Sequence, residues 1–147
     1  MEAFPDSVGA VVVVDVANVM GARADGWWRD PAGAALRLCR ELAGLAGRGV
    51  QARELPGVLN AETGQAGFVL VLEGRARDAA ARFGAPPFRV RVISAAGSGD
   101  DSIVTETGCL IASGVSCLVV TADRELRRRC AAEGASVAGP SWLLGRL

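Results

Sequence analysis

Residues 10–18 read AVVVVDVAN, and this stretch decides the fold class. The unbroken apolar run from Ala10 to Val14 is rich in β-branched side chains. That is typical of a strand buried on both faces, as the strands of parallel sheets are. Asp15 follows the run directly, so we expect its carboxyl group where solvent is scarce. The stretch therefore predicts a parallel sheet whose first strand ends at an acidic side chain.

Further strands and helices alternate along the chain. Strand-like runs follow at Phe68–Leu72, Phe88–Ile93, Cys117–Val120 and Ser136–Ala138. Helical patterns cover residues 31–46, 75–83, 101–113 and 124–133, whereas 21–29 and 51–66 are expected to be loops and 141–144 a closing turn. Strands that alternate with helices form parallel sheets with right-handed crossovers. We therefore expect a single α/β domain over residues 1–147, a three-layer α/β/α sandwich with a Rossmann-like, mostly parallel sheet of four to five strands.

The composition excludes several kinds of chemistry. The 147 residues carry 16 basic and 16 acidic side chains, and every basic one is arginine, because the chain has no lysine and no histidine. Without lysine there is no Schiff base and no P-loop lysine. Without histidine there is no Ser-His-Asp triad and no histidine-ligated zinc. Chemistry would then fall to carboxylates, hydroxyls, thiols, backbone groups or a bound metal ion.

Three sequence features indicate a cytoplasmic protein. Cys39, Cys109, Cys117 and Cys130 have no CxxC spacing and are expected to be buried, reduced side chains. The first six residues carry acids where a signal peptide needs bases. The apolar run from Val8 to Met20 is short and contains Asp15, so no membrane span is expected.

Acidic residues stand at or just beyond the ends of the four main strands, as Asp15, Glu73, Asp100, Asp101 and Asp123. The carboxyl ends of parallel strands meet at one rim of a sheet, so we expect these carboxylates to lie together. Two carboxylates 4 Å apart repel by about 4 kcal/mol at an effective dielectric constant of about 20. Either some of them are protonated or a cation lies among them. Hard oxygen ligands without histidine or thiolate select Mg²⁺ or Mn²⁺, and such an ion would activate a water and neutralise a phosphate.

Structural roles for the same acids remain open. Asp100, Asp101 or Asp123 could cap the helix that follows, which is compatible with metal binding. Glu73 could be a solvated strand end. Asn18 is expected in the turn that leaves the first strand, where it could hydrogen-bond Asp15 or a substrate phosphate, or form an ordinary Asx turn.

Several other side chains are candidate substrate contacts. Thr121 could orient Asp123, or be an ordinary strand residue. Arg75 and Arg124 lie close in sequence to the expected rim and could bind phosphates, or be solvated helix residues. The 21–29 loop contains Trp27, Trp28 and Arg29; an indole there could stack on an unpaired base, or pack the loop onto the domain.

Three segments together resemble one protein family. Residues 15–21, DVANVMG, resemble the D-x-x-N-V-x-G opening of NYN domains, which belong to the PIN-like nuclease superfamily. Residues 99–103, GDDSI, are similar to the start of a helix in that family, and residues 121–126, TADREL, to its S/T-x-D-x-x-L segment.

The resemblance implies an α/β/α sandwich that cleaves RNA with a metal ion and leaves a 5′ phosphate. By position, Asp15, Asp100 and Asp123 would bind the metal, Glu73 would be a fourth acid, Asp101 would assist, and Asn18 would support them.

The expected function is a metal-dependent endoribonuclease using Mg²⁺ or Mn²⁺. Its partner would be single-stranded or structured RNA, without a membrane, and a homodimer is possible. Two alternatives stay open: an RNA-binding NYN module that does not cut, and a nucleotide phosphohydrolase. A haloacid-dehalogenase-type phosphatase is disfavoured, because Ala17 stands where its second aspartate is needed and the chain has no lysine.

Overall fold

The computed structural model describes residues 4–5, 7–58, 63–87 and 89–147. Five strands form one sheet in the order β3-β2-β1-β4-β5, and every pair of neighbours is parallel. The strands are β1 (Val8–Asp15), β2 (Gln65–Leu72), β3 (Val90–Ser94), β4 (Ser116–Val120) and β5 (Ser136–Ala138). The expected α/β sandwich with a parallel sheet is confirmed.

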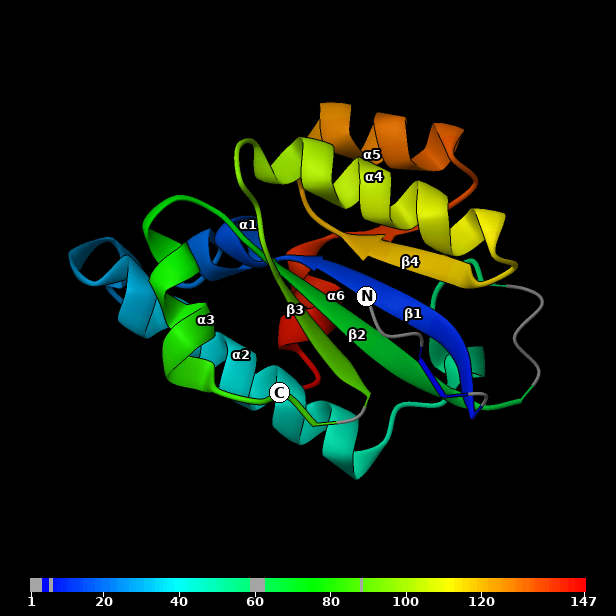
Figure 1. Cartoon of the computed structure of the whole chain (residues 1–147), viewed down its shortest axis with the longest axis horizontal. Coiled ribbons are helices and arrows are strands. Elements are labelled where there is room, and N and C mark those ends of the chain that lie inside the picture. Colours follow the sequence, from blue (N-terminus) through cyan, green and yellow to red (C-terminus); the bar gives the residue numbers. More distant parts are fainter. Residues whose placement is uncertain (1–3, 6, 59–62, 88) are drawn as a thin grey trace.

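Helices cover both faces of the sheet (Figure 1). One face carries α1 (Val16–Gly21), α2 (Pro31–Arg48), α3 (Asp78–Phe83) and α6 (Pro140–Leu144). The other face carries α4 (Gly99–Ala112) and α5 (Arg124–Ala132). Short 3-10 helices lie between these elements: η1 (Trp27–Arg29), η2 (Ala52–Glu54) and η3 (Gly74–Arg77). Among the described residues, no helix has the length and apolarity needed to cross a bilayer.

Strand β1 explains why both faces need helices. Its valines from Val11 to Val14 have no solvent exposure. Side chains of a strand alternate between the two faces, so Val12 and Val14 belong to the core beneath α2, whereas Val11 and Val13 belong to the core beneath α4 and α5. The unbroken apolar run is therefore a strand at the centre of the sheet.

Two short helices replace segments expected to be irregular. Residues 16–21 form α1, because the Asp15 carboxylate accepts a hydrogen bond from the backbone N–H of Asn18 at 3.3 Å and so caps a helix where the sequence suggested a turn. Residues 140–144 form α6, which begins with Pro140 at a position that favours helix starts.

Some of the segments predicted from the sequence lie partly outside the described residues. Phe88, the expected first residue of the third strand, lies outside them, and the described strand begins at Val90. Within the expected 51–66 loop, η2 is a helical turn and β2 already begins at Gln65, while residues 59–62 lie outside the described part. Most of the acidic first segment, residues 1–3 and 6, is also outside it.

Candidate active site

The order of the strands selects one point at the rim of the sheet. From β1 the chain continues to β2 and β3 on one side, and then crosses to β4 and β5 on the other. In open α/β sheets, ligands bind beyond the carboxyl ends of the strands at such a switch point. Asp15 ends β1 and Thr121 follows β4, one residue beyond the paired Val14 and Val120. Both side chains therefore stand at the switch point.

Asp15 is the most buried acid of the predicted set. Its relative exposure is 5%. One carboxylate oxygen accepts from the backbone N–H of Asn18, and the other accepts from the hydroxyl of Thr121 at 3.0 Å. Each oxygen keeps a second lone pair, so both could still bind an ion.

Thr121 links Asp15 to Asp123. The threonine is fully buried, and its oxygen accepts from the backbone N–H of Asp123 at 3.2 Å while its hydroxyl donates to Asp15. The Asp123 carboxylate in turn accepts from the N–H of Leu126 at 2.9 Å and caps α5. One hydroxyl therefore orients both acidic segments of the switch point.

Asn18 acts on the same junction from α1. Its side-chain oxygen accepts from the backbone N–H of Ala122 at 2.8 Å. The bond ties the helix that follows β1 to the loop that follows β4. Asn18 therefore holds these two segments together, and within the described ranges its amide nitrogen has no acceptor.

Glu73 joins the site from β2. Its carboxylate accepts from the backbone N–H of Gly99, the first residue of α4, at 2.7 Å. A Cβ on Gly99 would come within 2.7 Å of that carboxyl group, so only glycine allows this close approach. The next residue, Asp100, is half-buried in the first turn of α4. Glu73 thus positions the helix end that carries Asp100.

Burial and mutual repulsion raise the pKa values of two of these carboxyl groups, those of Asp15 and Asp100. Burial raises the pKa of Asp15 to about 6; repulsion from Glu73 and Asp100 adds to the rise, while the hydrogen bonds from Thr121 and Asn18 oppose it. Burial also raises the pKa of Asp100, with further repulsion from Asp123 and Glu73. These carboxylates are therefore close enough to destabilise one another's charge.

A divalent cation fits the chemistry of these donors. All are hard oxygen ligands, and a cation would relieve the repulsion that raises both pKa values. In the described part of the chain, no three acidic or thiol side chains converge closely enough to enclose an ion. Mg²⁺ commonly binds to one or two carboxylates and completes its shell with water and substrate phosphate, and this open arrangement suits that mode.

Asp101 points to a different partner. Its carboxylate accepts from the Arg129 guanidinium at 2.8 Å, and its side chain is 72% exposed. The pair bridges α4 and α5 beside the acids rather than among them. Ser98, three residues earlier, caps α4, because its hydroxyl oxygen accepts from the backbone N–H of Asp101 over a long distance of 3.5 Å.

The predicted substrate contacts divide into two groups. Arg75 and Arg124 are exposed and form no ion pair within the described residues, which leaves them available to phosphates. Trp27 is half-buried against the core, with Gly21 close to its ring. The exposed ring is that of Trp28, over which Arg29 lies.

Sequence reasoning did not anticipate the Glu73–Gly99 bond. A glycine as the first helical residue, directly before two acids, is a signal for such a close approach. The bond from Ala122 to Asn18 joins residues 104 positions apart, and no local pattern reveals it.

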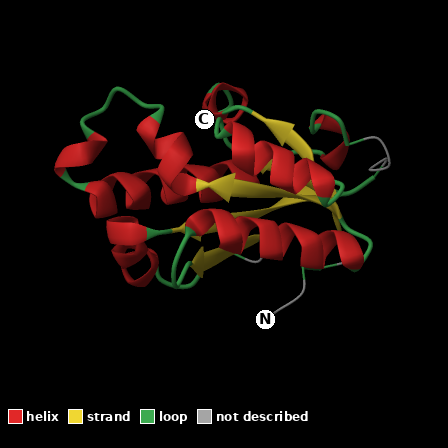
Figure 2. Ribbon diagram, turned by 90° about the horizontal axis from the view of Figure 1, so that it is seen from above, coloured by secondary structure: helices red, strands yellow, loops and turns green. Residues whose placement is uncertain are grey.

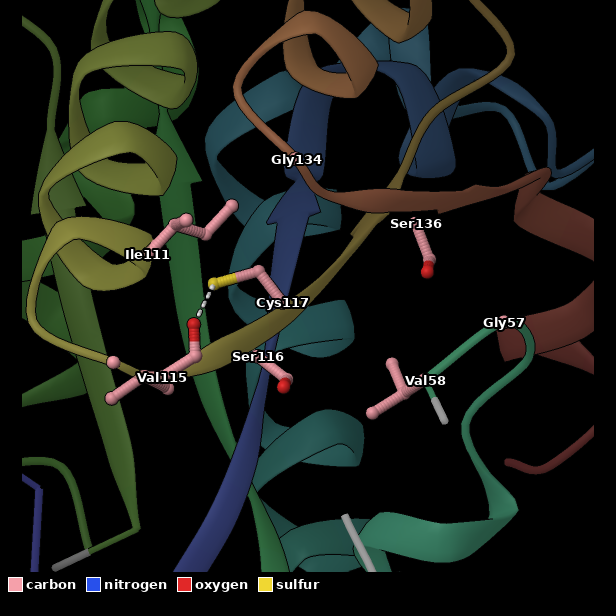
Figure 3. Close-up of a pocket in the computed structure, with 9 residues that line it drawn as sticks. Gly57, Val58, Ile111, Val115, Ser116, Cys117, Gly134 and Ser136 are labelled. Carbon is pink, nitrogen blue, oxygen red and sulfur yellow. Dashed lines mark hydrogen bonds between the residues drawn. The ribbon is translucent and has the colours of Figure 1, made fainter. Parts of the chain in front are cut away.

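A cavity of about 330 Å³, drawn in Figure 3, lies elsewhere, where β4 and β5 begin. Ser116 and Ser136, which begin β4 and β5, line it together with Val58 and Cys117. Burial raises the pKa of Cys117 to about 12, so its thiol is no nucleophile at neutral pH. The cavity contains none of the predicted site residues.

The structure is similar to that of a point mutant of Rae1 (YacP) from Bacillus subtilis, with a TM-score of 0.63 and 17% sequence identity. The match covers 92% of this chain and 73% of that one. At this identity, the likeness shows a shared fold. No protein-family model matches the sequence, and no curated protein does.

Proposed function

We propose that the chain is a metal-dependent endoribonuclease that cuts RNA at the acidic site. The observation that carries the proposal is the burial of Asp15 at the switch point, where Glu73 and Asp100 raise its pKa further. Carboxylates kept together at such a cost are typical of functional sites. The three motifs that resemble NYN domains support an RNA-directed nuclease, in an α/β fold that is shared with Rae1 (YacP).

The candidate metal ligands in this proposal are Asp15, Asp100, Asp123 and Glu73. One or two of them would contact the ion directly, and the others would act through its bound waters. A bound Mg²⁺ or Mn²⁺ would activate the attacking water and neutralise charge on the scissile phosphate. Thr121 keeps one Asp15 oxygen in a fixed orientation through its hydroxyl. Asp123 uses one oxygen to cap α5 and has its other oxygen for the ion. Asp101 would assist only after release from Arg129.

RNA would be held by groups around the same rim. Arg75 and Arg124 present guanidinium groups, which bind phosphates through two parallel hydrogen bonds. The amide nitrogen of Asn18 could donate to a phosphate oxygen. These contacts supply positive charge next to the acids in a chain whose formal net charge is zero.

The decisive test is cleavage of labelled single-stranded RNA with Mn²⁺ by the wild type and Asp15→Asn. We expect the wild type to yield products with a 5′ phosphate, and the variant to be slower by roughly 100-fold or more, since one ligand of the ion is lost. Asp78→Asn, at an exposed carboxylate in α3, is the matched control and should cut normally. Equal cleavage by wild type and Asp15→Asn would exclude the proposal.

The same assay separates the two alternatives. A module that only binds would retain RNA in a metal-sensitive way and give no product. A phosphohydrolase would release phosphate or pyrophosphate from nucleotides and leave RNA intact.

A further inference from the structure

Trp28 is an unusually exposed aromatic residue. Its relative exposure is 59%, and the only other large apolar side chain classed as exposed in the described ranges is Leu147, at 37%. An exposed indole keeps a large apolar surface in water. The ring is therefore accessible to another molecule.

The segment that carries Trp28 is held firmly in place. An ion pair between Arg23 and Glu41, and a second at 3.8 Å between Arg37 and Asp25, tie the loop to α2. The Trp27 ring packs on the core and meets the Trp28 ring edge to face, with centroids 6.1 Å apart and an interplanar angle of 88°. The Trp28 ring thus contacts a ring that packs on the core.

Positive charge accompanies the ring. The Arg29 guanidinium lies 5.9 Å from the centroid of the Trp28 ring. Arg29 has no ion pair with any described residue, whereas both other arginines near this loop do. An indole beside an unpaired guanidinium matches a nucleotide, which offers a flat base and a phosphate.

The position of the loop connects it with the acids. It runs from α1, which starts directly after Asp15, to the beginning of α2. Figure 1 shows it projecting beyond the sheet, and in Figure 2 the strand arrowheads point toward the same end. The 3-10 helices η1 and η3 both pack against α2, so the segments that carry Trp28 and exposed Arg75 share one supporting helix.

We propose that Trp28 and Arg29 form a stacking platform for an unpaired base of the RNA that is cut at the acidic site. This inference rests on the proposed function and gives its substrate class: single-stranded RNA long enough to span both places. Paired bases hide their faces in the helix, so a duplex cannot use the platform. The base stacks on Trp28, and Arg29 binds the adjacent phosphate.

The test measures binding of a labelled single-stranded RNA of about 12 nucleotides by fluorescence anisotropy, in an Asp15→Asn background that prevents cleavage. Trp28→Ala and Trp28→Leu should weaken binding roughly 5- to 150-fold, the range that stacking of one base spans, and Trp28→Phe should retain most of the affinity. Binding of a dinucleotide and of duplex RNA should not change. In the wild-type background, Trp28→Ala should raise KM for the long RNA and leave kcat unchanged.

Two control variants match the substitutions. Leu147→Ala removes the other exposed apolar side chain. Arg146→Ala removes an arginine that lies 4.7 Å over the ring of Trp142, for comparison with Arg29→Ala. Neither control should change RNA affinity, whereas Arg29→Ala should weaken it.

The outcomes separate this inference from the proposed function. Unchanged affinity in Trp28→Ala, or equal affinity of the Leu and Phe variants, would overturn the platform even if cleavage depends on Asp15. If Trp28→Ala keeps its RNA affinity but no longer binds a protein that the wild type binds, Trp28 belongs to a protein interface and the platform is refuted. Conversely, affinity that depends on Trp28, without any cleavage by the wild type, would retain the platform and refute the nuclease.

Discussion

At the scale of single residues, the folded protein disfavours the ionised form of Asp15. Burial removes its carboxylate from water, and Glu73 and Asp100 repel its charge. The hydroxyl of Thr121 and the backbone of Asn18 compensate only in part. The charge of Asp15 therefore opposes folding at neutral pH unless a cation or substrate group offsets it, which gives two predictions.

The first prediction concerns stability against pH. A pKa raised from 3.8 to about 6 means that the folded state holds the proton more tightly than the unfolded state. The associated stability is complete below about pH 4 and is lost as pH rises through about 6, a loss of about 3 kcal/mol. Asp15→Asn cannot titrate, so its free energy of unfolding relative to the wild type should rise by about that amount between about pH 4 and about pH 7.

Urea unfolding with EDTA present measures this difference without metal. The comparison within each pH cancels titration of acids outside the site, whereas Glu73 and Asp100, which repel Asp15, contribute to the measured difference. A difference that stays constant across the range would show that the Asp15 pKa is not raised.

The second prediction concerns Thr121. Thr121→Val keeps the shape but removes the hydrogen bond that lowers the pKa of Asp15, so the pKa should rise further, and stability should fall by about 1–3 kcal/mol. Thr121→Ser retains the hydroxyl and should resemble the wild type. Carbon NMR of the labelled carboxyl groups during a pH titration reads the pKa directly. An identical Asp15 titration in the Val and Ser variants would exclude this role for the hydroxyl.

At the scale of elements, the start of α4 depends on a side chain from another strand. Glu73, just beyond β2, accepts from the N–H of Gly99 at 2.7 Å. A negative carboxylate is favourable there because the N-terminus of a helix carries partial positive charge. The same contact places Asp100 next to the other acids.

Gly99→Ala tests this junction. The added Cβ would lie 2.7 Å from the Glu73 carboxyl group, so Glu73 must move away from the helix end. The Glu73 side chain can rotate away, so the expected loss of stability is that of its hydrogen bond to the Gly99 N–H, about 1–3 kcal/mol. RNA cleavage should fall at least roughly tenfold. Urea unfolding and kcat/KM measure the two effects.

Gly97→Ala is the matched control, because nothing lies within 4 Å of a Cβ at that position. It should change neither quantity appreciably. If both alanine variants behave alike, the close approach of Glu73 has no part in the site.

At the scale of the whole molecule, the site exists only because the chain crosses the sheet. Asp15, Glu73 and Asp123 come from three strands or their ends, and the strand order brings these ends to one rim. A ligand that binds there binds the folded state alone. Metal binding should therefore stabilise the entire domain.

Thermal unfolding tests this prediction. An ion at 100 times its Kd adds about 2.7 kcal/mol, so Mg²⁺ or Mn²⁺ should raise the Tm of the wild type by roughly 5–10 °C for a chain of this size. Asp123→Asn should lose most of the shift, whereas Asp78→Asn should retain it. The metal assignment fails if the wild type and Asp123→Asn shift equally.

The sequence alone determined that the sheet has helices on both faces and that most of the candidate acids stand at the ends of strands. The valine run of residues 11–14 predicted a strand buried on both faces, and Asp15 at its end followed from residue order. These features are local, because consecutive side chains determine whether a strand is buried and where a helix starts. The same local patterns predicted that acids stand at strand ends.

Only the tertiary structure decided which groups meet. It paired Glu73 with the start of α4, Asp101 with Arg129, and Asn18 with Ala122. It also packed Trp27 against the core and left Trp28 exposed, although the two are neighbours with the same side chain. The physical reason is that hydrogen bonds and burial depend on distances between segments far apart in the chain. Those distances are set by the packing of helices on the sheet and not by any local pattern.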